Sequence, residues 1–234
     1  MIKEIASYSS CITRLFVLES FLKDSRTTEI ENLLRPNGTR TIVVEDGVLQ
    51  RVGETKTPPP VAATVKCAGN GWDSLNGIAP TLLLVLDGLR DPGNLGTLVR
   101  SAAAFGADGI VVSGESVDIW NPKVVRSSAG LLWKIPIVAS RDFKEVALKL
   151  REFGMSLVAT IPNGGSQIDE VDLKSPIAVV IGSESAGIDE KALKECDFLA
   201  TIPMRNSIES LNAATSATVA LYEVVRQRGF ANLK

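Results

Sequence analysis

The apolar residues between positions 81 and 202 fall into short continuous runs, and amphipathic stretches separate these runs. The strand-sized runs lie at 81–87, 109–113, 135–139, 155–161, 177–181 and 199–202. Helix-like stretches lie at 94–105, 122–132, 143–153 and 190–195, and a last one follows Asn212. Continuous apolar strands that alternate with helices are typical of a mostly parallel sheet covered on both faces. The pattern therefore predicts an α/β fold for this part of the chain.

A smaller α/β unit is expected ahead of this sheet. Helices are predicted around 12–23 and 28–34, and strands at 41–44 and 61–66. Three successive prolines at 58–60 exclude a helix or a central strand at that point. The following stretch is rich in Gly, Asn and Pro, which predicts a loop or linker. The expected organisation is a small domain at 1–67, a linker at 68–80 and a larger domain at 81–234.

The composition narrows the class of protein. With 234 residues, 45% hydrophobic and 22% charged, the chain can bury a sizeable core as an ordinary globular protein. The apolar runs are too short to span a bilayer. Cys11, Cys67 and Cys196 are far apart and odd in number, so a disulfide framework is not expected and a reducing compartment suits the chain. We expect a cytoplasmic protein, or one of an organelle if the chain is a trimmed precursor.

The chain contains no histidine. This excludes His-based acid–base catalysis, the Ser-His-Asp triad and the usual zinc ligand sets, and no metal is expected. The formal net charge of −2 does not indicate nucleic-acid binding, but such binding depends on local patches rather than on the whole chain.

The first of three candidate loops runs from Leu86 to Gly106, LDGLRDPGNLGTLVRSAAAFG. Loops at the carboxyl ends of parallel strands are where such sheets bind ligands. Asn94 is predicted to cap the next helix, whose buried stripe would be Leu95, Leu98, Val99, Ala102 and Ala103. Arg100 lies beside this stripe. It either emerges near the end of the sheet or is an ordinary surface arginine of the helix.

The second loop is VVIGSESAGI, residues 179–188. Gly182 and Gly187 would let the backbone approach a flat ligand closely. Glu184 follows a buried strand, and a carboxylate there is costly to bury unpaired, so we expect a cationic or hydrogen-bond donor partner for it. Neither of the common phosphate-binding glycine motifs is present, which disfavours an unrelated nucleotide-binding enzyme of the doubly wound class.

The third loop opens the C-terminal run IPMRNSIESLNAATSATVALYEVVRQRG, residues 202–229. Glu209, Ser210 and Asn212 form a polar group ahead of a long helix, and Asn212 is predicted to be its N-cap. The helix would end in a cationic turn, Arg226 and Arg228, before Gly229. Taken alone, the run is equally consistent with a capped helix that packs on the sheet.

Taken together, the three loops resemble the SpoU (TrmH-type) branch of the SPOUT RNA methyltransferases. The motifs DPGNLGTLVRSAAAFG, IAVVIGSESAGI and IPMRNSIESLN occur in the family's order, and NPKVVRSSAG at 121–130 resembles its middle segment. The resemblance covers residues 82–229, and the N-terminal unit is loosely similar to the family's small substrate-binding domain. It implies transfer of a methyl group from S-adenosylmethionine to a ribose 2′-hydroxyl of RNA. It also implies a C-terminal trefoil knot and a homodimer.

The same resemblance assigns expected roles to individual residues. Gly182, Ile202 and Leu211 would contact the cofactor through their backbone, and Thr160 would line its pocket. Arg100 would act on the ribose hydroxyl, either as the activating group or by gripping the adjacent phosphate. The residues expected to build and orient the catalytic pocket are Asn94, Glu184, Ser210 and Asn212.

Four cations are candidates for contacts with the RNA backbone: Lys123, Arg126, Lys134 and Arg205. The alternative is that they are ordinary solvated surface residues. Ribosomal RNA is the expected substrate because of the extra N-terminal unit, and transfer RNA is the alternative. A catalytically inactive RNA-binding or ribosome-assembly protein on the same scaffold is a further alternative.

Overall fold

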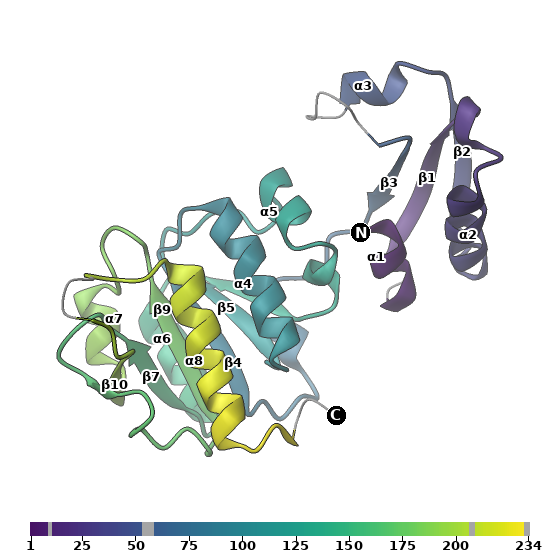
Figure 1. Cartoon of the computed structure of the whole chain (residues 1–234). Coiled ribbons are helices and arrows are strands. Elements are labelled where there is room, and N and C mark those ends of the chain that lie inside the picture. Colours follow the sequence, from purple (N-terminus) through teal and green to yellow (C-terminus); the bar gives the residue numbers. More distant parts are fainter. Residues whose placement is uncertain (9–10, 53–58, 206–208, 232–234) are drawn as a thin grey trace. The chain divides into compact units, whose positions relative to one another are not determined.

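The computed structural model describes residues 1–8, 11–52, 59–205 and 209–231. The chain divides into two compact units, Met1–Ala68 and Gly69–Lys234 (Figure 1). The stretch 69–80, which the composition predicts as a linker, is part of the second unit. It contains a short 3-10 helix, η3 (Trp72–Leu75), and Leu75 is buried in the core of that unit. The backbone N–H of Ala139 donates to the carbonyl of Asn70 at 2.7 Å, which holds this stretch against the sheet.

The first unit is a three-stranded sheet with short helices. In chain order it contains α1 (Ile2–Tyr8), β1 (Ile12–Leu18), η1 (Glu19–Phe21), α2 (Ser25–Leu34), η2 (Arg35–Asn37), β2 (Arg40–Val44), α3 (Val48–Val52) and β3 (Val61–Val65). The central strand β1 pairs in parallel with β2 and antiparallel with β3. Its Leu15 and Val17 are fully buried, as are Ile5 of α1 and Leu34 of α2.

One expectation for this unit is wrong. Residues 12–23 were expected to form a helix, but 12–18 form the central strand β1 and only 19–21 are helical. The segment ITRLFVL is rich in β-branched and aromatic residues, which fit a half-buried pleated surface better than a helix. The helix at 28–34 is confirmed within α2, and the strands at 41–44 and 61–66 are confirmed as β2 and β3. The helices α1 and α3 were not predicted.

The second unit is built on a seven-stranded sheet in the order β6-β5-β4-β9-β7-β10-β8, in which all pairs are parallel. The strands are β4 (Leu82–Asp87), β5 (Gly109–Ser113), β6 (Ile137–Ser140), β7 (Ser156–Thr160), β8 (Ser166–Gln167), β9 (Ile177–Gly182) and β10 (Phe198–Thr201). The helices are α4 (Pro92–Ala104), α5 (Pro122–Ser127), η4 (Leu131–Trp133), α6 (Phe143–Glu152), α7 (Glu190–Lys194) and α8 (Ala213–Gln227). The predicted parallel α/β fold is confirmed, while β8 was not predicted.

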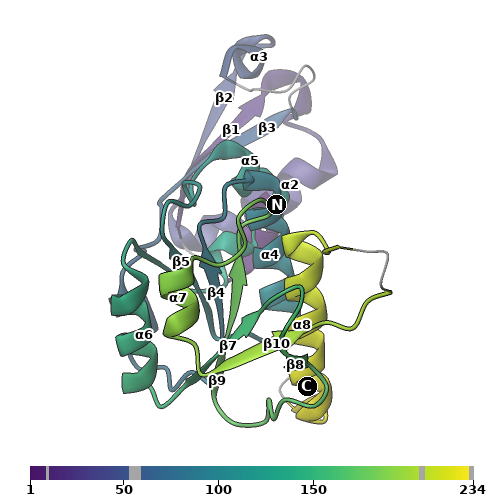
Figure 2. The same cartoon turned by 90° about the vertical axis from the view of Figure 1, so that its left-hand side faces the viewer.

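The continuous apolar runs are explained by helices on both faces of this sheet (Figure 2). Leu82, Leu84 and Leu86 of β4 belong to one core with residues of α4 and α8. Leu83 and Val85 point the other way, into a second core with residues of α6. A strand covered on both sides has no polar face, so the sequence of β4 does not alternate.

Strand β10 lies between β7 and β8, although β7 and β8 follow one another in the chain. The connection at 161–165 therefore passes over the position of β10. Only glycine fits at position 165 of this connection, because a Cβ there would stand 2.6 Å from the carbonyl oxygen of Leu199.

The two helices that follow the candidate loops begin differently. Asn212 caps α8 as predicted, because its Oδ1 accepts from the backbone N–H of Ala214 at 2.9 Å and of Thr215 at 3.3 Å. The predicted cap of α4 is wrong. Asp91 is the cap, its carboxylate accepts from the backbone N–H of Asn94 at 2.9 Å, and Pro92 opens the helix. The side chain of Asn94 is thereby free for other contacts.

The C-terminal end of α8 is anchored by Arg228. Its guanidinium donates to the carbonyls of Leu173, Thr81 and Ser175 at 3.1, 3.0 and 2.6 Å. Gly229 follows with a left-handed φ of 65° and ends the helix, as expected for a C′ glycine. Among the described residues, no helix is long and apolar enough to cross a membrane.

Replacing Arg228 by alanine is expected to lower the free energy of unfolding by about 1–3 kcal/mol, because three carbonyls lose a charged donor. Lys174→Ala removes a neighbouring charge whose side chain has no partner within the described ranges, and it should change stability by less than about 0.5 kcal/mol. Urea unfolding of both variants measures the difference. Equal free energies of unfolding for the two variants would show that the hydrogen bonds from Arg228 to the three carbonyls do not stabilise the fold.

Candidate functional site

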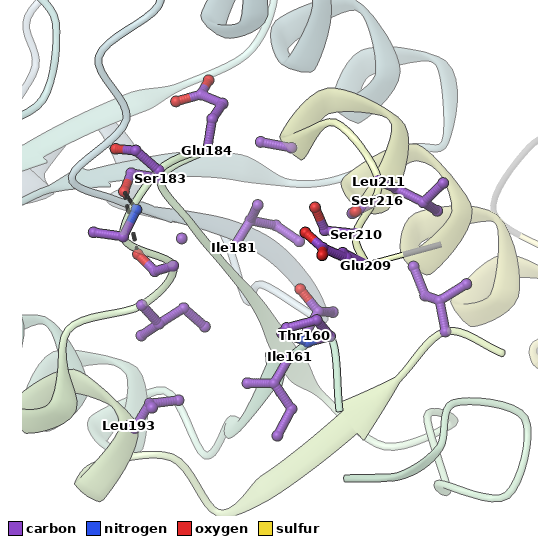
Figure 3. A pocket seen from close by; sticks show the side chains of 18 of the residues that line it. Thr160, Ile161, Ile181, Ser183, Glu184, Leu193, Glu209, Ser210, Leu211 and Ser216 are labelled. Carbon is purple, nitrogen blue, oxygen red and sulfur yellow. Dashed lines mark hydrogen bonds between the residues drawn. The ribbon is translucent and has the colours of Figure 1, made fainter. Parts of the chain in front are cut away.

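A pocket of about 470 Å³ opens where β7, β9 and β10 end and α8 begins (Figure 3). It is bounded by the segments 160–162, 181–188 and 209–211 together with Leu193, Ile202, Met204, Ala213 and Ser216. All four residues predicted to contact a cofactor line it: Thr160, Gly182, Ile202 and Leu211. Glu184 and Ser210, predicted as catalytic residues, line it as well.

The loop after β9 folds back over Gly182. Ser183 and Gly187 exchange two backbone hydrogen bonds of 2.9 and 3.0 Å, and Gly187 has a left-handed φ of 71°. A Cβ on Gly182 would overlap the backbone of Gly187 and Ile188. Glycine at 182 is therefore required by close packing against the chain itself, rather than by an unusual φ.

The chemistry of the walls is mixed. Ile161, Ile181, Met204 and Leu211 provide apolar surface, and Glu184 and Glu209 provide negative charge. Figure 3 shows Ser183 and Glu184 on one side of the pocket, and Glu209, Ser210 and Ser216 on the other. Such walls suit a ligand with a flat apolar part and a positively charged part.

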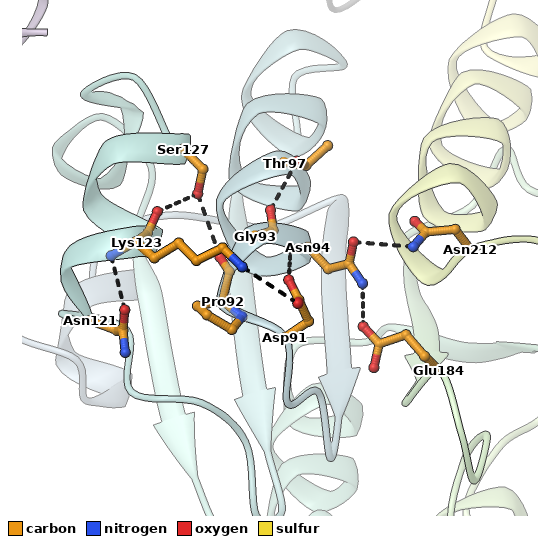
Figure 4. Close-up of polar contacts among 10 residues, drawn as sticks. All are labelled: Asp91, Pro92, Gly93, Asn94, Thr97, Asn121, Lys123, Ser127, Glu184 and Asn212. Carbon is orange, nitrogen blue, oxygen red and sulfur yellow. Dashed lines mark hydrogen bonds and ion pairs between the residues drawn. The ribbon is translucent and has the colours of Figure 1, made fainter. Parts of the chain in front are cut away.

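A chain of hydrogen bonds connects the three motif loops (Figure 4). Asn212 donates through Nδ2 to Oδ1 of Asn94 at 3.2 Å, and Nδ2 of Asn94 donates to Oε1 of Glu184. The expectation that Glu184 has a donor partner is confirmed. The donor-to-acceptor direction of these hydrogen bonds follows from the N-cap of α8. Because Oδ1 of Asn212 accepts from the helix, its amide nitrogen must face Asn94, and the nitrogen of Asn94 must then face the carboxylate.

Asp91 holds the backbone at Asn94 in place through its N-cap hydrogen bond. The backbone N–H of Asn94 is the main cause that holds the pKa of the Asp91 carboxyl below its usual value. Lys123 lies 3.7 Å from this carboxylate, so one of the four candidate RNA-binding cations is already in a weak ion pair. Gly96 lets α5 pack closely on α4, because a Cβ there would overlap the side chain of Ser127.

Arg100 is not brought into the pocket. It lies on the exposed side of α4 and does not line the cavity. Next to it in the chain, Ser101 bonds to Thr218 of α8 at 2.7 Å, which fixes α4 against α8. Arg126, Lys134 and Arg205 are also exposed. The sequence therefore predicted the residues of the pocket more closely than the position of Arg100 relative to it.

Several lining residues were not among the predicted site residues. Ser183 follows Gly182 directly, and its position just beyond a buried strand could have identified it. Glu209 stands in the polar group before α8, and Ser216 lies one turn after the N-cap, on the same helix face as Asn212 and Ala213. In the described parts of the chain no group of three or more acidic or Cys residues could hold a metal ion.

Known proteins resemble the chain in sequence and structure. Residues 81–222 match the SpoU rRNA Methylase family. A 23S rRNA (uridine(2479)-2′-O)-methyltransferase of Streptomyces viridochromogenes is 37% identical over 202 residues, which cover 84% of this chain and 70% of that protein. The 23S rRNA (guanosine-2′-O-)-methyltransferase RlmB of Nitrosomonas europaea is 34% identical over 214 residues, 90% of this chain and 82% of that one.

A solved structure extends the similarity over both units. The SpoU methyltransferase AviRb from Streptomyces viridochromogenes, in complex with the cofactor AdoMet, superposes with a TM-score of 0.86. The match has 33% sequence identity and covers 97% of this chain and 87% of that chain. The family match covers more than half of the chain and includes all three motif loops, and this chain belongs to the SpoU rRNA methylase family.

Proposed function

We propose that this protein is an RNA methyltransferase that transfers a methyl group from S-adenosylmethionine to a ribose 2′-hydroxyl of ribosomal RNA. The observation that carries the proposal is the pocket at the ends of β7, β9 and β10, which the second and third motif loops line and the Asn212–Asn94–Glu184 chain joins to the first. Two relatives named as 23S rRNA 2′-O-methyltransferases support the substrate class.

The pocket fits the cofactor in size and chemistry. Its volume of about 470 Å³ lies within the range of small-molecule sites, roughly 300–1,000 Å³. Ile181, Ile202 and Leu211 offer apolar surface for an adenine ring, and Glu184 and Glu209 offer negative charge for a sulfonium. When bound, the cofactor supplies an activated methyl group on a positively charged sulfur. Thr160, Gly182, Ile202 and Leu211 would hold it.

The residues of the chain must orient the ribose hydroxyl and help to remove its proton. No histidine is available for this. The guanidinium of Arg100 is a poor base, because its pKa lies above about 12. We infer that Arg100 grips the phosphate next to the target ribose and lowers the pKa of the hydroxyl electrostatically. Since Arg100 is exposed on α4, the RNA would lie across this helix.

Asn94, Glu184, Ser210 and Asn212 would build the catalytic pocket. The chain of amides fixes the carboxylate of Glu184 at the mouth of the cavity, with one oxygen bound by Asn94. Ser210 lines the other side of the pocket (Figure 3). The exposed cations Lys123, Arg126, Lys134 and Arg205 would contact the RNA backbone, which positions the substrate but does not specify its sequence.

Two further features of the family are proposed for this chain. A homodimer is supported by apolar side chains that α8 and the residues after it leave exposed: Val219, Tyr222 and Phe230. Tyr222 contacts the rings of Phe105 and Phe230, with centroids 6.1 and 6.0 Å apart. A trefoil knot is supported by β10, which lies between two strands that are consecutive in the chain. The N-terminal unit, 1–67, would help to bind the RNA.

The test is transfer of label from methyl-labelled S-adenosylmethionine to RNA by the purified chain, followed by mapping of alkali-resistant 2′-O-methyl positions. We expect label in ribosomal RNA that lacks the modification. Label only in transfer RNA would overturn the substrate. Cofactor and RNA binding without any transfer would identify an inactive RNA-binding protein. Light scattering of the same sample gives the mass of one copy or of two.

Asn94→Asp is expected to lower methyl transfer by roughly tenfold or more, because it replaces the donor to Glu184 with a second carboxylate. The matched control is Asn121→Asp. Asn121 caps α5 by accepting from the backbone N–H of Lys123 at 2.9 Å, and an aspartate can do the same. Turnover and thermal unfolding of both variants are compared. If Asn94→Asp behaves like the control, the amide chain has no part in the reaction.

A further inference from the structure

A second pocket, of about 590 Å³, lies on the other side of the loop that follows β9. Ser183, Ser185, Ala186 and Gly187 line both pockets, so this loop is a partition between them. The rest of the second pocket comes from the ends of β4 and β5 and from the N-terminal ends of α6 and α7. Its lining residues Phe143 and Ala192 belong to the core on the sheet face that α6 and α7 cover (Figure 2). Outside the partition loop, none of the pocket's lining residues has a role in the proposed methyl transfer.

The inner wall of this pocket contains a buried carboxylate. Asp87, the last residue of β4, is only 6% exposed and lines the cavity. Its Oδ2 accepts from the backbone N–H of Asp189 at 3.1 Å, but no described residue donates to its Oδ1. A Cβ on Gly114 would stand 3.2 Å from Oδ1, so the glycine leaves this oxygen uncovered. Burial is the main cause that raises the pKa of Asp87.

A second buried polar group stands beside Asp87. Ser113 is the register partner of Asp87 on the neighbouring parallel strand, so the two side chains lie on the same face of the sheet. The hydroxyl of Ser113 is fully buried and has no partner among the residues that the structure describes. Buried polar groups are normally hydrogen-bonded, so an open carboxylate oxygen next to an unpaired hydroxyl is unusual.

The rim of the pocket carries charges of both signs, four cations and the acidic side chains of Glu115, Asp142, Asp189 and Glu195. Each of these acids already has a partner within the protein: Arg90, the backbone N–H of Lys144, the backbone N–H of Lys191 and Arg151, respectively. Arg141 and Lys144 stand at the start of α6, Lys191 at the start of α7, and Arg90 after β4. Arg90 lies 3.9 Å from Glu115. The side chains of Arg141, Lys144 and Lys191 have no partner in the described segments, and all three residues are exposed. Exposed, unpaired cations around an acceptor-lined cavity suit a ligand that is anionic outside and carries hydrogen-bond donors inside.

We propose that the second pocket is an RNA subsite, which takes a nucleotide next to the methylated one with its phosphate at Arg141 and Lys144 and its base at Asp87. A nucleotide has the required chemistry, because the amino and imino groups of a base can donate to a carboxylate. Unstacked bases of single-stranded RNA are commonly bound in this way. The proposal rests on the proposed function, and it adds a position for the strand that leads to the reaction site.

The partition loop connects the two pockets physically. A nucleotide in the second pocket would contact the same four residues, 183 and 185–187, whose other side lines the cofactor pocket. Binding of the RNA and order in the cofactor pocket would thus be linked through one loop. Glu184 stands between these residues and lines only the cofactor pocket.

The test compares two double variants of the full chain. Arg141→Ala/Lys144→Ala removes the proposed phosphate contacts. Lys149→Ala/Lys194→Ala removes two positive charges from α6 and α7 outside the pocket, so the net charge of the two proteins is equal. We expect the first variant to bind single-stranded substrate RNA roughly tenfold or more weakly. The slope of log affinity against log salt should become shallower by about 1.4. The control variant should match the wild type in RNA affinity and in salt slope. The affinity for S-adenosylmethionine should be the same in all three proteins.

Asp87→Asn tests the base contact separately. Asparagine keeps an oxygen for the N–H of Asp189 but removes the second carboxylate acceptor. RNA with a photoreactive thiolated base should crosslink to the peptide that contains Asp87. In the Asn variant the base preference at that nucleotide should change while the salt slope stays as in the wild type.

Each outcome decides the proposal. RNA affinity and salt slope equal to those of the control variant would overturn it. Weaker S-adenosylmethionine binding with unchanged RNA binding would assign the pocket to the cofactor instead. If free guanosine monophosphate protects Arg141 from chemical modification but RNA binding does not depend on it, the RNA assignment fails. If the wild type transfers methyl groups and the Arg141→Ala/Lys144→Ala variant binds RNA as tightly as the wild type, the proposed function stands and only the subsite is excluded.

Discussion

Replacing Gly182 by alanine is expected to abolish S-adenosylmethionine binding, with a loss of affinity of at least roughly a hundredfold. A Cβ on Gly182 would lie closer than 3.0 Å to the backbone of Gly187 and Ile188, a distance that real Cβ atoms essentially never show. Backbone cannot rotate away as a flexible side chain can. The loop 183–187 would have to move, and it forms one wall of the pocket proposed to hold the cofactor.

Calorimetric titration with S-adenosylmethionine measures this effect, and thermal unfolding shows whether the variant is folded. Gly69→Ala is the matched control, because a Cβ there meets nothing within 4 Å. Gly187→Ala gives an intermediate case. Position 187 has open space for the methyl group but a φ of 71°. The substitution should therefore lower the free energy of unfolding by about 1–2 kcal/mol without a steric overlap. Cofactor binding by a folded Gly182→Ala protein at wild-type affinity would show that the loop does not form the wall of the site.

The sheet of the second unit could be predicted from the sequence because its strands are buried on both faces. Runs such as LLLVL at the start of β4, before Asp87, have no polar positions to compete with the strand interpretation. The first unit is harder, since β1 carries Arg14 and Thr13 between apolar residues and can be taken for part of a helix. β8 has two residues, Ser166 and Gln167, and exists only because β10 lies beside it. No local pattern predicts such a strand.

The site shows a similar division. The motif loops could be predicted, because strand ends meet at one edge of a parallel sheet. That Glu184 has a donor partner could be predicted as well, but not that the partner is Asn94. The cap of α4 could not be chosen from the sequence, since Asp91 and Asn94 are both good N-cap residues. The second pocket has no sequence motif. Asp87 and Arg141 are 54 positions apart, and only the order of the strands brings their loops to one cavity.

Replacing Arg100 by alanine is expected to lower methyl transfer by roughly 10²–10³-fold and to leave S-adenosylmethionine binding unchanged. The two effects separate because Arg100 lies outside the pocket proposed for the cofactor, on the exposed side of α4. A residue that only stabilised the fold would lower both, or would lower the melting temperature. Within the described residues the side chain of Arg100 has no partner, so its removal breaks no contact of the protein itself.

Single-turnover transfer with saturating cofactor and RNA measures the chemical step, and cofactor titration is run on the same preparations. Thr97→Ala, three residues earlier on the exposed side of α4, controls for changes to the helix surface, and Lys194→Ala controls for the loss of one positive charge. Arg100→Lys should recover part of the rate, because an ammonium keeps the charge but not the planar fork that binds a phosphate in two places. A full rate in Arg100→Ala would exclude any role of this arginine at the ribose hydroxyl. We would then expect the proton to leave by way of Glu184 or Ser210, which line the same pocket.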